Sequence, residues 1–403
     1  MKLHRPNTVL ALILALAVVL TACSKKTSTS TSSSQAPTAV PTLSATSFTS
    51  DFSAMSQLTG LAASGKGTIG VLLPDTASSA RYVSFDQPLL TQAFQKAGLS
   101  ASQFTIDNAQ GSESTQLTQA QALITGGASV LLVDALSSGV GANIEKYAKD
   151  NGVKTIDYDR LVLGGSRDAY VSFDNVKVGG FIGQGAVDCV TEWNVAKPAV
   201  FELDGSPDDN NATLFAQGYN AALKAKFDDG SYTKVGEQAV PKWNNDTAQT
   251  IFTQQYTAHK NINTVVAAND GLGNSVINVL KNNKIAAKTV PVTGQDATLQ
   301  GMQNVLATYQ CGSVYKPIFL ETQAAAALAI YLRAGQTPPA QLLNGTTKDT
   351  GATPNVDVPS VLLTPVWVTA KNMASTVIAD KFVDKAQLCA GAFAASCSSA
   401  GIS

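Results

Sequence analysis

Polar residues stand at the ends of most apolar runs in this 403-residue sequence. Asp159-Arg160, Asn269-Asp270 and Gln295-Asp296 each follow a short, mainly apolar run. Carboxylates accept hydrogen bonds, guanidinium groups donate them, and side-chain amides do both. A fixed set of such groups can bind a ligand rich in hydroxyls, because a hydroxyl also donates and accepts. A single Asp or Asn at such a position could equally cap the following helix, although the paired residues exceed what capping requires.

A monosaccharide suits this set of side chains. Its C–H face is apolar, so an aromatic ring is a suitable floor for it. Tyr82, which follows Arg81, and Trp243, in the polar stretch PKWNNDT, supply such rings. Each candidate also has a structural explanation. Arg160 could form a surface ion pair, Trp243 could lie in the core, and Lys316, which precedes a proline, could be an exposed turn residue.

The apolar runs are expected to be strands that position these polar ends. The expected strands are Thr68–Leu73, Ser129–Val133, Thr155–Tyr158, Tyr170–Phe173, Ala199–Leu203, Val265–Ala268 and Val290–Thr293. Helical patterns lie between them, for example over Asp86–Gly98 and near Ala142–Asn151. Continuous apolar strands that alternate with helices indicate α/β architecture, with parallel sheets covered on both faces. The number of strands favours two doubly wound lobes, whose ligand would bind beyond the carboxyl ends of the strands.

The composition excludes several functional classes. Lys and Arg total 28 against 29 Asp and Glu, and only 14% of the residues are charged. A near-neutral chain is a poor nucleic-acid binder, because neutralisation of phosphates supplies most of that affinity. Two histidines, His4 and His259, leave little material for histidine-based catalysis or a zinc site, so we expect no metal and no cofactor.

The N-terminus has the pattern of an export signal. A basic head precedes an apolar run from Val9 to Leu20, which is shorter than the ~20 residues that span a membrane. The run ends in Leu20-Thr21-Ala22-Cys23, which resembles a bacterial lipobox. We expect residues 1–22 to be a lipoprotein signal peptide and Cys23 the lipid anchor; the alternative is a plain secretory signal with an incidental cysteine. Residues 23–65 are expected to be the anchor and a tether, because Ser and Thr dominate residues 24–50.

Four cysteines remain beyond Cys23, and their state is left open by the sequence. Cys389 and Cys397 are close enough in the chain to close a small loop, and Cys189 and Cys311 are the other two. An even number is compatible with two disulfides, but buried free thiols would also explain these residues.

Six short motifs resemble those of the xylose-binding periplasmic proteins of ABC importers, in the ribose-binding-like type I superfamily. They are, in order, YDR (158–160), YVSFDN (170–175), GSPDDNNA (205–212), VVAAND (265–270), TGQDA (293–297) and VYKPI (314–318). The resemblance covers roughly residues 66–390. It implies the periplasmic-binding-protein type I fold, with two doubly wound parallel-sheet lobes joined by a three-segment hinge. We expect residues 66–173 and 317–358 to form the N-terminal lobe, and residues 174–316 and 359–403 the C-terminal lobe.

The resemblance also implies which residues bind the ligand. Tyr82 departs from the family pattern, which has tryptophan there, and this leaves the particular pentose or hexose open. The arginines and Asp159 would belong to the N-terminal lobe and Lys316 to a crossover. The residues of the C-terminal lobe would be Asp209, Asn211, Trp243, Asn269 and Asp296. The expected ligand-binding residues are Arg81, Tyr82, Asp159, Arg160, Asp209, Asn211, Trp243, Asn269, Asp296 and Lys316.

The function that the resemblance implies is capture of a monosaccharide, D-xylose or a similar sugar, outside the cytoplasm. A lipid-anchored monomer, attached to the membrane through its anchor alone, would close on the sugar and deliver it to an ABC transporter permease. The alternative is a sugar-sensing receptor subunit for a chemotaxis or signalling partner. An enzyme is not expected, because adjacent carboxylates such as Asp208-Asp209 seldom flank one glycosidic bond. A transcriptional regulator on the same fold would need a basic DNA-binding segment where the export signal stands.

Overall fold

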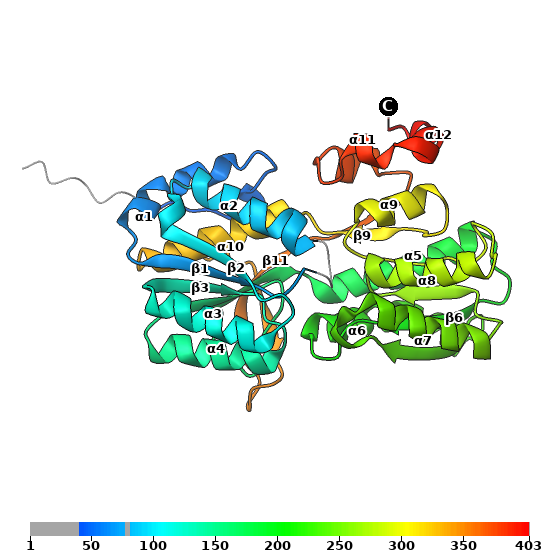
Figure 1. The fold of residues 1–403 in the computed structure, drawn as a ribbon, viewed down its shortest axis with the longest axis horizontal. Helices are drawn as coiled ribbons and strands as arrows, with labels where there is room; N and C mark the ends of the chain where they lie inside the picture. Colours follow the sequence, from blue (N-terminus) through cyan, green and yellow to red (C-terminus); the bar gives the residue numbers. More distant parts are fainter. Residues whose placement is uncertain (1–39, 77–80, 403) are drawn as a thin grey trace, which may run out of the picture. The chain divides into compact units, whose positions relative to one another are not determined.

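The computed structural model describes residues 40–76 and 81–402 (Figure 1). The expected signal peptide and the expected anchor Cys23 lie outside the described residues. Along the two described ranges, no helix is both long enough and apolar enough to cross a membrane.

The first sheet has seven strands, in the order β10-β11-β5-β4-β3-β1-β2. All neighbours are parallel except β10 and β11, which form an antiparallel edge. The strands are β1 (Thr68–Leu73), β2 (Phe104–Asn108), β3 (Ala128–Val133), β4 (Lys154–Tyr158), β5 (Ala169–Phe173), β10 (Gly345–Asp349) and β11 (Val356–Leu363).

Helices cover both faces of this sheet, because alternate strand residues are apolar on both sides. Leu72 and Leu131 pack with helices α3 (Glu113–Thr125) and α4 (Ser138–Asp150). Val71 and Leu132 belong to the larger core on the opposite face, with helices α1 (Thr59–Ser64), α2 (Gln87–Lys96) and α10 (Ile318–Arg333). This lobe is therefore doubly wound, as expected.

The second lobe is built on strands in the order β7-β6-β8, all parallel. Bridges from Val265 to Val292 and from Gln295 to Val314 continue the parallel pairing toward an antiparallel pair, β9 and β12. The strands are β6 (Ala199–Asp204), β7 (Thr233–Ala239), β8 (Thr264–Ala267), β9 (Ser313–Tyr315) and β12 (Val366–Val368). The helices are α5 (Asn175–Glu192), α6 (Asn210–Asp228), α7 (Asn245–Ala258), α8 (Asp270–Asn282), α9 (Leu299–Leu306), α11 (Lys385–Leu388) and α12 (Ala394–Ser399).

Close packing of α5 on α6 fixes the start of α6, which carries two pocket residues. A Cβ atom at Gly179 would lie 2.0 Å from the carbonyl oxygen of Phe215. A Cβ atom at Gly218 would lie 2.2 Å from the carbonyl oxygen of Val176. Glycine is therefore required on both helices for their backbones to approach this closely.

The chain passes between the two lobes in three places. These are the connections from β5 to α5, from β9 to α10, and from β11 to β12. The last connection differs from the expected boundary at residue 358, because β11 continues beside β5 as far as Leu363. Residues 359–363 thus belong to the first sheet and not to the C-terminal lobe.

One expected strand is absent from the described residues, and two edge strands are present that the sequence does not predict. Val290–Thr293 is not a strand, since only Val292 makes a bridge to Val265. The sequence does not predict β7, because TKVGEQA is polar. All seven of its positions are partly or fully exposed, since β7 lies at the edge of its sheet. β2 is likewise an edge strand and only partly buried. An edge strand exposes one side to water, so it lacks the continuous apolar run that identified the central strands.

The expected tether does not extend to residue 65. Leu43, Phe48 and Phe52 are buried in the main core, each with an exposed fraction of 4% or less. The backbone carbonyls of Pro41 and Thr49 accept hydrogen bonds from side chains of α10. The Ser and Thr content of this segment concealed its spaced apolar residues, whose burial attaches it to the first lobe.

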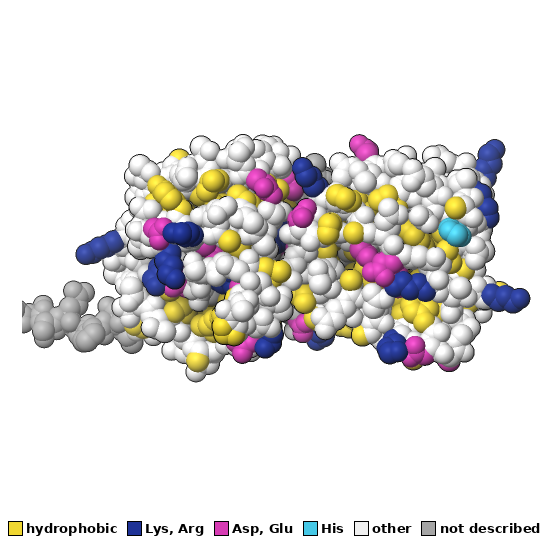
Figure 2. All heavy atoms as spheres, turned by 90° about the horizontal axis from the view of Figure 1, so that it is seen from below, with side chains coloured by type: hydrophobic (Ala, Val, Ile, Leu, Met, Phe, Trp, Pro, Cys, Tyr) yellow, Lys and Arg dark blue, Asp and Glu magenta, His cyan; other side chains and the backbone are white. Residues whose placement is uncertain are grey.

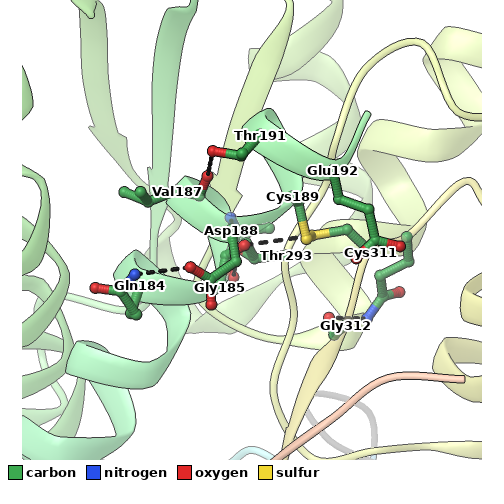
Figure 3. Close-up of a disulfide and its surroundings, with 12 residues drawn as sticks. Gln184, Gly185, Val187, Asp188, Cys189, Thr191, Glu192, Thr293, Cys311 and Gly312 are labelled. Atoms are coloured by element: carbon green, nitrogen blue, oxygen red, sulfur yellow. Dashed lines mark hydrogen bonds between the residues drawn. A yellow bond between two sulfur atoms is a disulfide. The ribbon is translucent and has the colours of Figure 1, made fainter. Parts of the chain in front are cut away.

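Two disulfides connect the four described cysteines. Cys189 on α5 is bonded to Cys311, just before β9, with Cα atoms 6.0 Å apart (Figure 3). Cys389, which follows α11, is bonded to Cys397 on α12 and closes the short loop between these helices. The first bridge spans 122 residues of sequence and ties α5 to the strand that leads to Lys316.

Candidate functional site

One pocket is lined by all of the expected ligand-binding residues. They are Arg81, Tyr82, Asp159, Arg160, Asp209, Asn211, Trp243, Asn269, Asp296 and Lys316. Phe215 and Gln295 complete the lining, and the cavity that these side chains enclose has a volume of about 30 Å³. The residues lie at the carboxyl ends of strands and the starts of the following helices in both lobes, as the crevice rule for parallel sheets requires.

Arg81 is held by three carboxylates of the first lobe. Its guanidinium donates to Asp86 at 3.0 and 2.7 Å, to Asp159 at 2.7 Å and to Glu321 of α10 at 2.7 Å. Burial alone would raise the pKa of Asp159, but the charge of Arg81 holds that pKa below its usual value. The side chain of Asp159 is therefore an ionised acceptor with a fixed direction.

Asp159 has a left-handed backbone, with φ of 60°. In this conformation its carbonyl oxygen accepts hydrogen bonds from the Tyr170 hydroxyl at 2.8 Å and from Asn211 Nδ2 at 2.9 Å. Asn211 lies in the second lobe. Asp159 therefore offers its side chain to the pocket, while its backbone carbonyl binds the opposite lobe.

Arg160 lies between the two lobes. Its Nε is 3.3 Å from Oδ2 of Asp209 in the second lobe and 3.5 Å from Asp134 in the first. Its Nη2 donates to the Tyr82 hydroxyl at 3.0 Å. The alternative of a surface ion pair for Arg160 is therefore wrong, because Arg160 is buried and its ion pairs form part of the pocket.

Trp243 and Phe215 supply aromatic walls from the second lobe. Trp243 Nε1 donates to Asp209 at 3.1 Å, and its ring meets that of Phe215 edge-on at 6.4 Å. Gly205 leaves room for the indole, since a Cβ atom there would lie 2.0 Å from it. Phe215 follows Asn211 by one helical turn on α6, a spacing that could have identified it from the sequence.

Asn269 and Asp209 combine helix capping with a place in the pocket. Asn269 Oδ1 accepts from the Leu272 amide at 2.9 Å, and Asp209 Oδ1 accepts from the Asn211 amide at 2.9 Å. For these two residues capping and a place in the pocket are therefore not alternatives. A cap leaves the other side-chain atoms directed outward from the helix N-terminus, so one residue can serve both purposes.

Lys316 and Asp296 form the third charged pair of the lining. Lys316 Nζ lies 3.3 Å from Asp296 Oδ1 and 6.0 Å from the centre of the Phe215 ring. Both residues are buried, with exposed fractions of 4% and 7%. Lys316 is therefore not an exposed turn residue. Gln295 beside this pair donates to the Ala268 carbonyl at 3.2 Å, and its Oε1 has no hydrogen-bond partner among the described residues.

The lining balances three acids against three bases. The acids are Asp159, Asp209 and Asp296, and the bases are Arg81, Arg160 and Lys316. Behind this layer, burial raises the pKa of Asp134 well above its usual value and that of Glu321 to about 8. Asp134 and Glu321 therefore favour their neutral form. Because the lining itself has as many acids as bases, the pocket presents no large net charge to a ligand.

The sequence of this chain matches the model of a known protein family. Residues 69–337 match a family model described as a periplasmic binding protein domain. This chain belongs to the periplasmic binding protein family. The expected fold class and the resemblance to xylose-binding periplasmic proteins are both confirmed.

Relatives of this periplasmic binding protein bind sugars. It is 38% identical over 284 residues to the D-xylose-binding periplasmic protein of Escherichia coli (strain K12), covering 70% of this chain and 82% of that one. It is 31% identical over 340 residues to the multiple sugar-binding periplasmic protein SbpA of Azospirillum brasilense, covering 81% and 92% of the two chains.

A solved structure has a similar fold. A carbohydrate transporter solute binding protein from Chloroflexus aurantiacus, in complex with D-glucose, has a TM-score of 0.70 and 26% identity. The match covers 79% of this chain and 97% of that one.

Proposed function

We propose that this protein captures a neutral monosaccharide, D-xylose or a related pentose or hexose, between its two lobes. The observation that carries the proposal is the buried pocket, in which acidic, amide and basic side chains from both lobes converge beside two aromatic rings. Hydroxyl groups can replace water at these donors and acceptors, and the apolar face of the sugar can contact an aromatic ring.

The charge of the lining supports a neutral sugar. Each acid of the lining has a basic partner within 3.5 Å, in the pairs Asp159–Arg81, Asp209–Arg160 and Asp296–Lys316. A sugar acid or an amino sugar would leave one charge of this set without a counter-charge, at a high cost in a buried site. The same pairing argues against turnover, because no carboxylate is available as a separate acid or nucleophile.

The names of the relatives support a sugar as the ligand. The relative from Escherichia coli is named for D-xylose and the one from Azospirillum for several sugars. The Chloroflexus structure contains D-glucose. We therefore extend the proposal to both pentoses and hexoses.

The contacts between the lobes support capture by closure. In the structure Arg160 of the first lobe pairs with Asp209 of the second, and Asn211 Nδ2 donates to the Asp159 carbonyl oxygen at 2.9 Å. A sugar that inserts between these groups would add hydrogen bonds to both lobes at once, so that binding favours the closed state.

We further propose that the protein works outside the cytoplasm as a monomer, is anchored by a lipid on Cys23, and delivers its sugar to an ABC transporter permease. The export-signal pattern of residues 1–22 supports this location, as do the names of the periplasmic relatives. The anchor is tested by a Cys23→Ser variant, which should leave the membrane fraction of the cell and appear in the soluble extracytoplasmic fraction.

The sugar is identified by a thermal-shift screen of xylose, glucose, galactose, ribose and arabinose, followed by calorimetry. A ligand that binds only the native state raises the melting temperature. Asp296→Ala should weaken binding of the selected sugar about 10- to 100-fold, which corresponds to about 1–3 kcal/mol for an unpaired buried group. Asp246→Ala, an exposed acid on α7, is the control and should bind normally. If no sugar in the panel raises the melting temperature or produces heat, the proposal fails.

A further inference from the structure

An aromatic pair connects the two lobes at a distance from the charged lining of the pocket. The rings of Phe85 and Phe382 are stacked, with centroids 4.0 Å apart and planes inclined by 13°. Phe85 lies on the turn of helix Tyr82–Asp86 in the first lobe, just after two pocket residues, Arg81 and Tyr82. Phe382 lies near the C-terminus, in a segment that packs on the second lobe.

Phe382 also touches the pocket-bearing part of the second lobe. Its ring lies 4.8 Å from that of Tyr315, on β9, which directly precedes Lys316. Tyr315 is buried, and its hydroxyl donates to Asp380 at 3.0 Å. Phe382 thus contacts one segment of each lobe, and each segment also carries a pocket residue. The pocket residue is Tyr82 in the first lobe and Lys316 in the second.

The local backbone holds Phe382 in this position. The preceding residue, Lys381, has a left-handed conformation with φ of 57°. The amides of Lys381 and Phe382 donate back to Ile378 and Val377, which ends the short helix Ala374–Ile378. A left-handed residue with such backward hydrogen bonds is a well-defined way to end a helix and directs the next side chain.

The segment that carries Phe382 is attached to the second lobe. Val383 is buried in the core, and Gln303 of α9 donates to the Gln387 carbonyl of α11 at 3.3 Å. Figure 1 shows α11 and α12, in red, next to α9, in yellow. The disulfide between Cys389 and Cys397 closes the following loop. Movement of the second lobe must therefore carry Phe382 with it.

We propose that Phe382 is a positioning residue for sugar binding, which stacks on Phe85 when the lobes close and holds Arg81 and Tyr82 opposite Lys316. Opening of the lobes separates the stacked rings and exposes both to water. The stacking therefore stabilises only the closed state and raises the closed fraction before any sugar binds. This inference rests on the proposed capture of a sugar by closure.

The test is sugar affinity in Phe382→Ala, measured by calorimetry, with the dissociation rate from stopped flow. We expect affinity about 5- to 10-fold weaker, mainly through faster dissociation, because the closed state loses its stacking. Phe382→Tyr keeps the ring and should restore wild-type affinity. Phe393→Ala is the matched control: this ring lies on the same C-terminal segment and packs partly buried on the core, outside the stacked pair.

Phe85→Ala tests the pair from the other lobe and does not disturb the C-terminal segment. It should weaken binding as much as Phe382→Ala, and the double variant should bind no more weakly than either single variant, because both remove one interaction. Additive losses, or unchanged affinity in both single variants, would overturn the inference.

A measurement without sugar separates this inference from the proposed function. Small-angle X-ray scattering of the sugar-free protein should show a larger radius of gyration for Phe382→Ala than for wild type and Phe393→Ala. If wild type binds none of the sugars, the proposed function fails, while the scattering difference still tests the pair. If wild type binds sugar and the scattering and affinity of Phe382→Ala are unchanged, the pair has no positioning role.

Discussion

Arg160 Nε of the first lobe lies 3.3 Å from Asp209 Oδ2 of the second. This ion pair forms part of the pocket lining, and Asp209 also accepts a hydrogen bond from Trp243. One carboxylate thus orients a base from the opposite lobe and an aromatic ring from its own.

Asp209→Ala should weaken sugar binding about 10- to 100-fold, because it leaves Arg160 buried without one of its partners. Calorimetry with the selected sugar measures the loss. Asp209 also caps α6, so the control is Asp174→Ala, which removes a comparable cap from α5. Asp174 does not line the pocket, so its variant should lose stability and retain affinity. Equal affinities in the two variants would show that Asp209 acts only as a cap.

Trp243→Phe should abolish any change in tryptophan fluorescence that sugar produces in the wild-type protein. The indole lines the pocket, whereas Trp193 and Trp367 do not. Binding should also weaken, because phenylalanine cannot donate to Asp209 as the indole nitrogen does. A fluorescence titration of the variant checks both effects. An unaltered fluorescence signal would assign the change to one of the other tryptophans and remove Trp243 from the sugar contact.

The stability of the sugar-free protein should fall as the pH rises from about 5 to 8. Burial raises the pKa of Glu202 to about 7 and that of Glu321 to about 8. These groups bind a proton more tightly in the folded than in the unfolded chain. Their contribution to stability is therefore complete below the unfolded pKa and is lost as the pH passes through the folded value.

Urea denaturation at pH 5 and pH 8 measures this slope. Glu202→Gln should reduce the difference in unfolding free energy between the two pH values by about 1–3 kcal/mol. Glu192→Gln, an exposed glutamate paired only with Lys371 at the surface, should leave the difference as in wild type. A wild-type protein that is more stable at pH 8 would contradict the prediction.

Replacing Cys189 and Cys311 with serine should lower the unfolding free energy by about 2–5 kcal/mol. This disulfide closes a chain segment of 122 residues, so it restricts the unfolded state strongly. The bridge between Cys389 and Cys397 spans 8 residues, and its double-serine variant should lose less stability. Urea denaturation of the two variants compares them. A larger loss from the shorter loop would contradict this ordering.

Acidic and basic side chains are mixed on the surface (Figure 2), as the nearly equal numbers of acidic and basic residues in the sequence would suggest. On the face drawn in Figure 2, acidic and basic side chains of the described residues are scattered among each other and do not form one continuous basic area. The charged groups that matter for the proposed function are buried instead, in the pocket lining.

The sequence alone determined the central strands and the residues at their ends. Thr68–Leu73 has the bounds that its apolar run predicted, and Ser129–Val133 and Thr155–Tyr158 each differ by a single residue at the start. Strands buried on both faces have continuous apolar runs, and the residues that follow them lie at the crevice. The apolar run and its polar end can both be read from a few consecutive residues. Edge strands such as β7 lack a continuous apolar run. The segment Val290–Thr293 has the apolar composition of a strand but forms only an isolated bridge at Val292.

The tertiary structure alone decided which distant residues meet. The pairing of Cys189 with Cys311, the place of Phe215 in the lining and the stacking of Phe85 on Phe382 all depend on how elements pack across the molecule. The packing of Leu43 and Phe48 into the first lobe is of the same kind. Periodicity and motifs report the environment of a residue along its own element, whereas partners from remote segments are selected by the shape of the assembled core.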